Sequence, residues 1–150
     1  MTAFTYQYPR PMVTVDVVVF NSQTDQLHVL LIQRALEPFQ GAWAIPGGFV
    51  AMNESLEEAA GRELAEETGV EGVHLEQLQT YGDPNRDPRG RVISVAFCTL
   101  LPSGSIQHIH GGGDASQARW FPVHKLPDLA FDHSKIIADA LNWVKDRIDH

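Results

Sequence analysis

Three glutamates lie close together near the middle of the chain. They are Glu63, Glu66 and Glu67, within the stretch GRELAEETGV (61–70). If this stretch is helical, like charges three and four residues apart repel one another by roughly a few tenths of a kcal/mol per pair. Such a placement needs a compensating interaction, so these residues are the first candidates for a functional site.

A helix is predicted over residues 55–68. Ser55 and Glu58 form a capping box at its start, and Gly69 is well placed to end it. On a helical wheel the apolar arc contains Glu67 and has Glu63 beside it, with Glu66 at the flank. A glutamate-rich helix face is usually solvated, but that explanation fails for glutamates that point toward the body of the protein. The arc itself is marked by Leu56, Ala60 and Leu64.

Arg62 is the only basic residue of this helix. On the wheel it faces solvent, where we expect it to pair with Glu58, so it cannot neutralise all three glutamates. A buried carboxylate costs on the order of several kcal/mol unless it is paired, protonated or bound to a metal. Mg²⁺ or Mn²⁺ fits best, because these ions take oxygen ligands and keep positions for water and phosphate.

A glycine corner precedes the helix. Pro46, Gly47 and Gly48 lead toward it through Glu54. Glycine lets the backbone approach a ligand closely and offers an unobstructed carbonyl. Taken alone, the two glycines are explained equally well by a plain turn from strand to helix.

These residues resemble a complete Nudix box. Gly48, Glu54 and the stretch RELAEETGV (62–70) fill every specified position of that motif. Three further stretches are similar to the ADP-ribose pyrophosphatase branch of the superfamily. They are PFQGAWAIPGGFV (38–50), YGDPNRDPRGRVISVAF (81–97) and DASQARWFPVHKLPDLAFDH (114–133).

The resemblance implies an α+β fold, the Nudix α/β/α sandwich with a mixed central sheet, and Mg²⁺-dependent hydrolysis of a nucleoside diphosphate linked to another group. Carried onto this sequence, the metal ligands are Glu63, Glu66 and Glu67 with the Gly47 carbonyl, and Arg62 orients the glutamates. Gly48 and Glu54 are assigned to substrate binding.

Two residues compete for the activation of water. Asp114, in the GGGD stretch, is the candidate that a later loop supplies. Many relatives have glutamate where this chain has Gln117, which leaves Glu63 as both ligand and base. Arg34 and Arg91 are the arginines expected to hold phosphate in their forked guanidinium groups, and Arg86 and Arg89 rank below them.

The remaining pattern places this site in a single domain spanning residues 1–150. Residues 21–26 read as a turn, 82–90 as a polar loop, and 102–114 as a mobile segment. A second amphipathic helix closes the chain at 133–148. Strands are expected at 13–20, 27–34, 43–45, 73–81, 91–101 and 118–123.

Composition limits the partners. The chain has 150 residues and a net charge of -8 from 19 acidic and 11 basic residues, which argues against nucleic-acid or anionic-membrane binding. No signal peptide is recognisable, and the lone Cys98 reads as a buried hydrophobe in a reducing compartment. We therefore expect a cytoplasmic protein with a small nucleotide diphosphate substrate, and a homodimer remains open.

Two rival functions share these residues. One is a house-cleaning pyrophosphatase for nucleoside triphosphates, which would differ only in its substrate pocket. The other is a non-catalytic regulator that binds ADP-ribose and carries a DNA-binding domain. The intact glutamate set and a chain that ends at His150, without room for a winged helix, disfavour the regulator.

Overall fold

The computed structural model describes residues 3–23, 26–102 and 108–148. Strands and helices follow one another as β1 (Met12–Gln23), β2 (Gln26–Arg34), β3 (Trp43–Ala44), β4 (Gly47–Phe49), α1 (Leu56–Thr68), β5 (Glu76–Tyr81), β6 (Val92–Leu101), β7 (Ala115–Pro122) and α2 (His133–Ile148).

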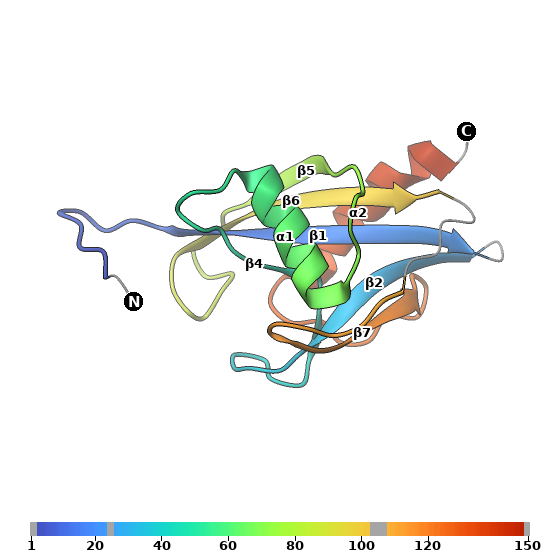
Figure 1. Ribbon diagram of the computed structural model, residues 1–150, viewed down its shortest axis with the longest axis horizontal. Coiled ribbons are helices and arrows are strands. Elements are labelled where there is room, and N and C mark those ends of the chain that lie inside the picture. The colour runs from blue at the N-terminus through green and yellow to red at the C-terminus, as the bar shows by residue number, and fades with distance from the viewer. Residues whose placement is uncertain (1–2, 24–25, 103–107, 149–150) are drawn as a thin grey trace.

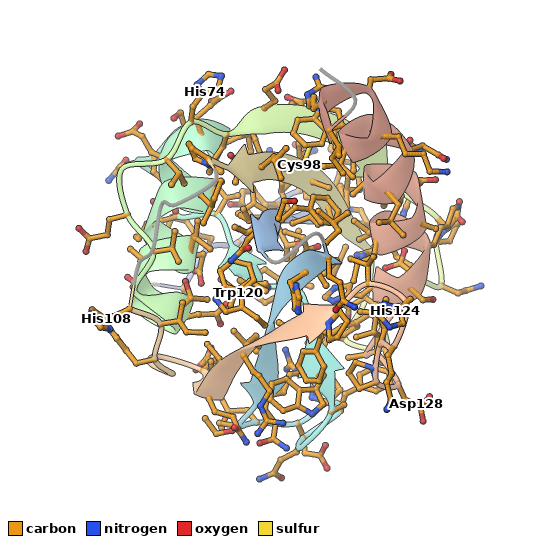
Figure 2. All side chains as sticks on the ribbon, turned by 90° about the vertical axis from the view of Figure 1, so that its right-hand side faces the viewer. His74, Cys98, His108, Trp120, His124 and Asp128 are labelled. Carbon is orange, nitrogen blue, oxygen red and sulfur yellow. The ribbon has the colours of Figure 1, made fainter. Side chains whose placement is uncertain are left out.

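The strands form one mixed sheet with a helix on each face. Its seven strands run in the order β3-β2-β1-β6-β5, with β4 paired to β1 and β7 paired to β2. The central pair, β1 and β6, is parallel, and β1 pairs antiparallel with β2 and β4. In Figure 1, α1 crosses in front of the sheet while α2 lies behind it, and Figure 2 shows the two helices on opposite sides of the strands. The α+β sandwich expected from the sequence is confirmed.

Strand β1 supplies side chains to both layers because successive residues of a strand point to opposite faces. Val17 and Val19 pack in the cluster under α1, together with Leu64. Val18 and Phe20 belong to the cluster under α2. Burial on both faces explains the nearly continuous apolar run of β1.

The sheet opens where β1 and β2 separate. These strands pair only from Phe20 to Gln23 on β1, and farther along β1 its partner is β4, with Asp16 opposite Gly47. The N–H of Val17 donates to the Pro46 carbonyl at 2.8 Å. The segment between β3 and β4 therefore fills the gap between the two long strands and brings Gly47 to the centre of the molecule.

Both helices begin and end close to the predicted positions. Ser55 is the N-cap of α1 with a complete capping box, and Gly69 ends the helix in the left-handed conformation at φ 84°. Several strand boundaries differ from expectation. Strand β7 begins at Ala115, three residues before the predicted start, and Gly47–Phe49, expected as a corner, form β4. Asn21–Gln23, expected in a turn, continue β1, because cross-strand pairing with β2 outweighs their turn propensity. Strand β5 begins at Glu76, three residues after the predicted start at Val73.

Cys98 is buried in the layer under α2, as predicted, and burial raises the pKa of its thiol to about 12. In Figure 2 it is labelled next to β6. In the described parts of the chain, neither helix is both long and apolar enough to cross a bilayer.

The cap of α1 gives a stability prediction. The Ser55 hydroxyl accepts from the Glu58 N–H at 3.1 Å, and the Glu58 carboxylate accepts from the Ser55 N–H at 3.0 Å. Ser55→Ala should therefore lower the free energy of unfolding in urea by about 1 kcal/mol. Ser134→Ala, an exposed serine of α2, should change it by less than about 0.5 kcal/mol. Equal effects of the two substitutions would contradict the capping role.

Candidate functional site

A polar cavity of about 370 Å³ lies where the sheet opens. Helix α1, the corner between β3 and β4, and the first residue of α2 all contribute to its wall. The predicted site residues that line it are Arg34, Gly47, Gly48, Arg62, Glu63, Glu67 and Asp114. The cavity is also lined by residues to which the sequence analysis assigned no role or a low rank, namely Asp16, Arg86, Asp87, Arg89, Phe131 and His133.

Glu67 is the buried carboxylate of the site. Its residue is 4% exposed, and its Oε1 accepts from the Gly47 N–H at 2.8 Å. Burial raises the pKa of Glu67 to about 8, against the Gly47 hydrogen bond, and the neighbouring carboxylates of Glu63, Asp114 and Asp16 raise it further. The wheel therefore placed this glutamate correctly, and its charge is costly in the absence of a compensating cation.

The two glycines of the corner are required by close approach. A Cβ at Gly47 would collide with the backbone carbonyl oxygen of Val15 and stand 2.6 Å from a carboxylate oxygen of Asp16, and one at Gly48 would stand 2.6 Å from the carboxyl carbon of Glu63. These separations are too short for real side-chain atoms, so a larger residue at Gly47 would push β4 away from β1, and one at Gly48 would displace the Glu63 carboxylate. The plain-turn explanation therefore misses the packing reason for both glycines.

Arg62 contacts the glutamates directly, contrary to the helical-wheel expectation that it faces solvent. Its guanidinium donates to Glu54 at 2.6 Å, to Glu63 at 2.8 Å and to Glu66 at 3.3 Å. The expected pair with Glu58 is wrong, because the Glu58 carboxylate accepts the N–H of the N-cap residue instead. A helical wheel fixes the direction of Cβ, but the long arginine side chain reaches around the helix to the loop that carries Glu54.

These ion pairs set the charge state of the box. Hydrogen bonds from Arg62 and from the Ala51 N–H lower the pKa of Glu54 to about 2. Burial raises the pKa of Glu63, although its bond with Arg62 opposes the shift. The Glu66 side chain is 53% exposed and lies outside the cavity wall. Glu54 also lies outside the wall and reaches it only through Arg62.

The donor set fits a hard divalent cation. Within the described residues, no three or more His, Cys, Asp or Glu side chains are gathered tightly enough to hold an ion as they stand, since Glu63 and Glu66 are turned toward Arg62. Nevertheless, Glu67 experiences the repulsion of Glu63, Asp114 and Asp16. Carboxylate oxygens that repel one another across a polar cavity are the ligands that Mg²⁺ and Mn²⁺ prefer.

The segment 108–114 packs against the end of α1. The His110 N–H donates to the Thr68 carbonyl at 3.0 Å, and Gly112 lies so close to the Glu66 carbonyl that a Cβ would collide with it. Asp114 follows, exposed to solvent but lining the cavity. Of the stretch expected to be mobile, residues 103–107 lie outside the described residues. Gln117 is held by Gln33 at 2.7 Å and is absent from the cavity wall.

The arginines are distributed differently from the prediction. Arg91 does not line the cavity, and its guanidinium donates to the Gly82 carbonyl at 2.6 Å. The lower-ranked pair faces the cavity instead. Arg86 forms two bonds to Asp132, at 2.7 and 2.9 Å, and Arg89 contacts Asp87 at 2.7 Å. The loop sequence alone does not show which arginines turn inward, because that depends on these carboxylates.

Arg34 is the cavity arginine without a carboxylate partner among the described residues. Its Nε donates to the Pro38 carbonyl at 2.7 Å. Burial and the nearby positive charge of Arg89 lower its pKa, while Glu67 and Asp114 oppose the shift. The guanidinium lies 5.1 Å from the centre of the Phe131 ring. A half-buried cation repelled by a second arginine is suited to binding an anion.

Sequence reasoning gave no role to the buried pair of Asp16 and His133. Their exposures are 6% and 4%, and the distance from His133 Nε2 to Asp16 Oδ1 is 3.6 Å. The available signal was the single acid that interrupts the apolar run VTVDVVVF (13–20). A charge in the middle of a strand buried on both faces indicates a buried polar partner.

Comparison with known proteins identifies a family whose members are similar to this chain over most of its length. The family model described as "NUDIX domain" matches residues 10–140. An ADP-ribose pyrophosphatase of Methanocaldococcus jannaschii is 43% identical over 136 residues, covering 91% of this chain and 76% of the relative. The ADPR responsive transcriptional repressor NtrR of Acinetobacter baylyi is 36% identical, and the match covers 89% of this chain but only 54% of the repressor.

Solved structures give the same relationship. A MutT/nudix family protein from Enterococcus faecalis superposes with a TM-score of 0.85 at 36% identity, covering 96% of this chain and 66% of that one. The NUDIX domain of Shewanella oneidensis NrtR, solved with ADP ribose, gives 0.83 at 38% identity and covers 91% and 90% of the two chains. With a family match over most of its length and this box in place, the chain belongs to the Nudix family and is a Nudix hydrolase.

Proposed function

We propose that residues 1–150 form a single Nudix domain that cleaves the diphosphate bond of ADP-ribose or a related nucleoside diphosphate sugar into two monophosphates, with Mg²⁺ or Mn²⁺ as cofactor. The observation that carries the proposal is the meeting of Glu63, Glu67 and Asp114 with Arg34 on one cavity. The cavity thus offers carboxylates for a cation and a guanidinium for phosphate oxygens.

The similar proteins support the substrate class. The pyrophosphatase at 43% identity is named for ADP-ribose, and the NrtR domain at 38% identity was solved with that nucleotide. The net charge of -8 supports a small molecule held by a local guanidinium and a cation, rather than a nucleic acid. That the protein forms a homodimer stays a prediction.

Each side chain has a defined task in this proposal. When bound, a divalent cation neutralises the diphosphate and lowers the pKa of water. Glu63, Glu66 and Glu67 would hold the cation together with the Gly47 carbonyl, and Arg62 would orient Glu63 and Glu66. Arg34 would bind a phosphate oxygen. Either Asp114 or Glu63 would take the proton of the attacking water.

The arginine pairing weighs against the triphosphate alternative. Arg86 and Arg89 are already paired with Asp132 and Asp87, so Arg34 is the arginine of the cavity wall that has no carboxylate partner in the part of the chain that the structure describes. A triphosphate would bring more negative charge than a diphosphate ester, and the same wall would neutralise less of it. The regulator alternative would keep ADP-ribose binding without turnover, and a hydrolysis assay separates it directly.

The proposed function predicts metal-dependent turnover of a defined substrate. With Mg²⁺ or Mn²⁺ in the millimolar range, the protein should release AMP and a sugar phosphate from ADP-ribose, measured by chromatography, because the carboxylates need a cation to bind diphosphate. Excess chelator should abolish the reaction. Full turnover in chelator would refute the metal-dependent mechanism. If nucleoside triphosphates are hydrolysed faster than ADP-ribose, the proposed substrate class is wrong.

Glu67→Gln should separate catalysis from stability. We expect kcat to fall by about a hundredfold or more, because a ligand to the cation is lost. Without metal, the variant should be more stable than the wild type at pH 8 by roughly 2 kcal/mol, since it removes a buried charge. Stability is measured by urea denaturation in chelator.

The pH dependence of that difference follows from the raised pKa of Glu67. In the native state the Glu67 carboxyl has a pKa of about 8, so it stays protonated until the pH approaches that value. In the unfolded state its pKa is 4.5. Wild-type stability in chelator should therefore fall as pH rises from about 5 to 8, and the Glu67→Gln curve should be flatter. A variant that unfolds but keeps full activity in its folded fraction would make Glu67 structural.

Asp114→Asn tests which residue activates water. If Asp114 is the base, kcat should fall by about 10² or more at saturating Mg²⁺, with the midpoint of the metal titration unchanged. Asp128→Asn removes the same charge from an exposed position outside the cavity (Figure 2) and should leave kcat unchanged. A loss below about tenfold for Asp114→Asn would move the base to Glu63.

A further inference from the structure

A chain of buried polar groups lies on the α2 side of the cavity. The Ser94 hydroxyl on β6 donates to Asp16 Oδ2 on β1, and the Ile45 N–H donates to His133 Nδ1 at 3.0 Å. Asp16 and His133 both line the cavity. Buried polar groups are costly in a core that is otherwise apolar, so this chain needs an explanation beyond packing.

The hydrogen bond from Ile45 fixes the form of the imidazole. Burial lowers the pKa of His133 despite the opposing charge of Asp16, so the ring is neutral. Because Nδ1 accepts the Ile45 N–H, the single ring proton must be on Nε2. The cavity wall therefore carries a histidine N–H donor at Nε2.

This donor and the nearby carboxylate oxygen do not satisfy each other. Nε2 of His133 and Oδ1 of Asp16 are 3.6 Å apart, beyond hydrogen-bond distance. Neither atom has a closer hydrogen-bond partner among the residues that the structure describes. Both atoms face the cavity rather than the packed core, since the buried side-chain atom left without a partner among the described residues is Asn21 Oδ1. The pair is therefore suited to a ligand group that enters between them.

A hydroxyl group matches this pair, because it accepts from an N–H and donates to a carboxylate at the same time. A phosphate does not match it, since the negative charge of Asp16 faces the site and Arg86 is already held by Asp132. A sugar hydroxyl is therefore the group of a nucleoside diphosphate sugar that fits here.

Phe131 provides an apolar surface next to the pair. Its ring centre lies 5.3 Å from that of His133, and its backbone has a φ of 53°, which is unfavourable for a phenylalanine. Residues are held in such conformations where the surrounding structure requires them, often beside ligands. The C–H face of a sugar ring can pack on an aromatic ring while its hydroxyls bind polar groups.

We propose that Asp16 and His133 bind a hydroxyl of the terminal sugar, the one linked through the diphosphate to the nucleoside. This assignment rests on the proposed function and extends it to two residues outside the Nudix box. It makes the α2 side of the cavity selective for a sugar, while the α1 side carries the cation and the diphosphate.

The test compares two substrates in the wild type and in Asp16→Asn. ADP-ribose carries the terminal sugar, and the methyl ester of ADP keeps the nucleoside and diphosphate but lacks that sugar. Loss of a hydrogen bond to a charged group should lower kcat/KM for ADP-ribose by about tenfold to a hundredfold. Because Asp16 also acts on the charge of Glu67, the substitution affects both substrates, and the test is the ratio: the loss in kcat/KM should be at least about tenfold greater for ADP-ribose than for the methyl ester.

Two histidine variants separate binding from support of the fold. His133→Asn keeps an acceptor near Nδ1 for the Ile45 N–H but removes the donor at Nε2, so it should lose the preference for ADP-ribose. His133→Gln places an amide N–H near Nε2 but loses the acceptor, so it should lose stability and keep the preference. The reverse pattern would make His133 a purely structural residue.

The remaining outcomes are decisive. The sugar site is refuted if Asp16→Asn slows the hydrolysis of both substrates equally. It is also refuted if the wild type prefers the methyl ester, and this second comparison does not depend on the folding of any variant. If the loss disappears when the nucleoside ribose is replaced by deoxyribose, the hydroxyl belongs to the nucleoside and the assignment is wrong. Hydrolysis of neither compound by the wild type would refute the proposed function, and the sugar site with it.

Discussion

The hydrogen bond from the Gly47 amide to the buried Glu67 carboxylate joins α1 to the centre of the sheet. At 2.8 Å, it brings a helical side chain against a backbone N–H that sits beside β1. The corner can lie there because Gly47 has no side chain to meet the Val15 carbonyl and Asp16, and Gly48 leaves room for the Glu63 carboxylate. Replacing either glycine would therefore displace the carboxylates as well as the turn.

Charge pairing then divides the cavity into regions. Arg62 binds three carboxylates of the box, while Arg86 and Arg89 each hold an aspartate. Among the described residues, Arg34, Glu67 and Asp114 line the cavity without an ion pair. Uncompensated charges of opposite sign on one polar wall indicate where a cation and an anion would bind. The arginines and carboxylates that form ion pairs hold the surrounding loops in place and leave little charge for a ligand.

The parts of the site that the sequence predicted are those set by local signals. The capping box and Gly69 fixed the ends of α1, and the period of the helix turned Glu67 inward. The extension of β1 through Asn21 was missed, because pairing with His28 on the next strand overrides local turn propensity. Helix boundaries were easier to predict because their determinants lie within a few residues of one another.

The missed parts depend on contacts between distant segments. Arg86 turns inward because Asp132 lies there, 46 residues later in the chain, whereas Arg91 in the same loop turns to a backbone carbonyl. The spacing of arginines in GDPNRDPRG (82–90) and its neighbour Arg91 contains no information on this choice. The same holds for Asp16, whose partners are on β6 and α2.

The corner between β3 and β4 is held from both faces of the sheet. Glu67 of α1 accepts the N–H of Gly47, and His133 of α2 accepts the N–H of Ile45, two residues earlier. Two helices that do not share a face thus fix the backbone of one short segment. Because Asp16 lies against this segment and acts electrostatically on both Glu67 and His133, the two sides of the cavity are mechanically and electrostatically connected. The hydrogen bonds from the two helices thus meet on three consecutive residues of backbone, 45–47, at the floor of the cavity.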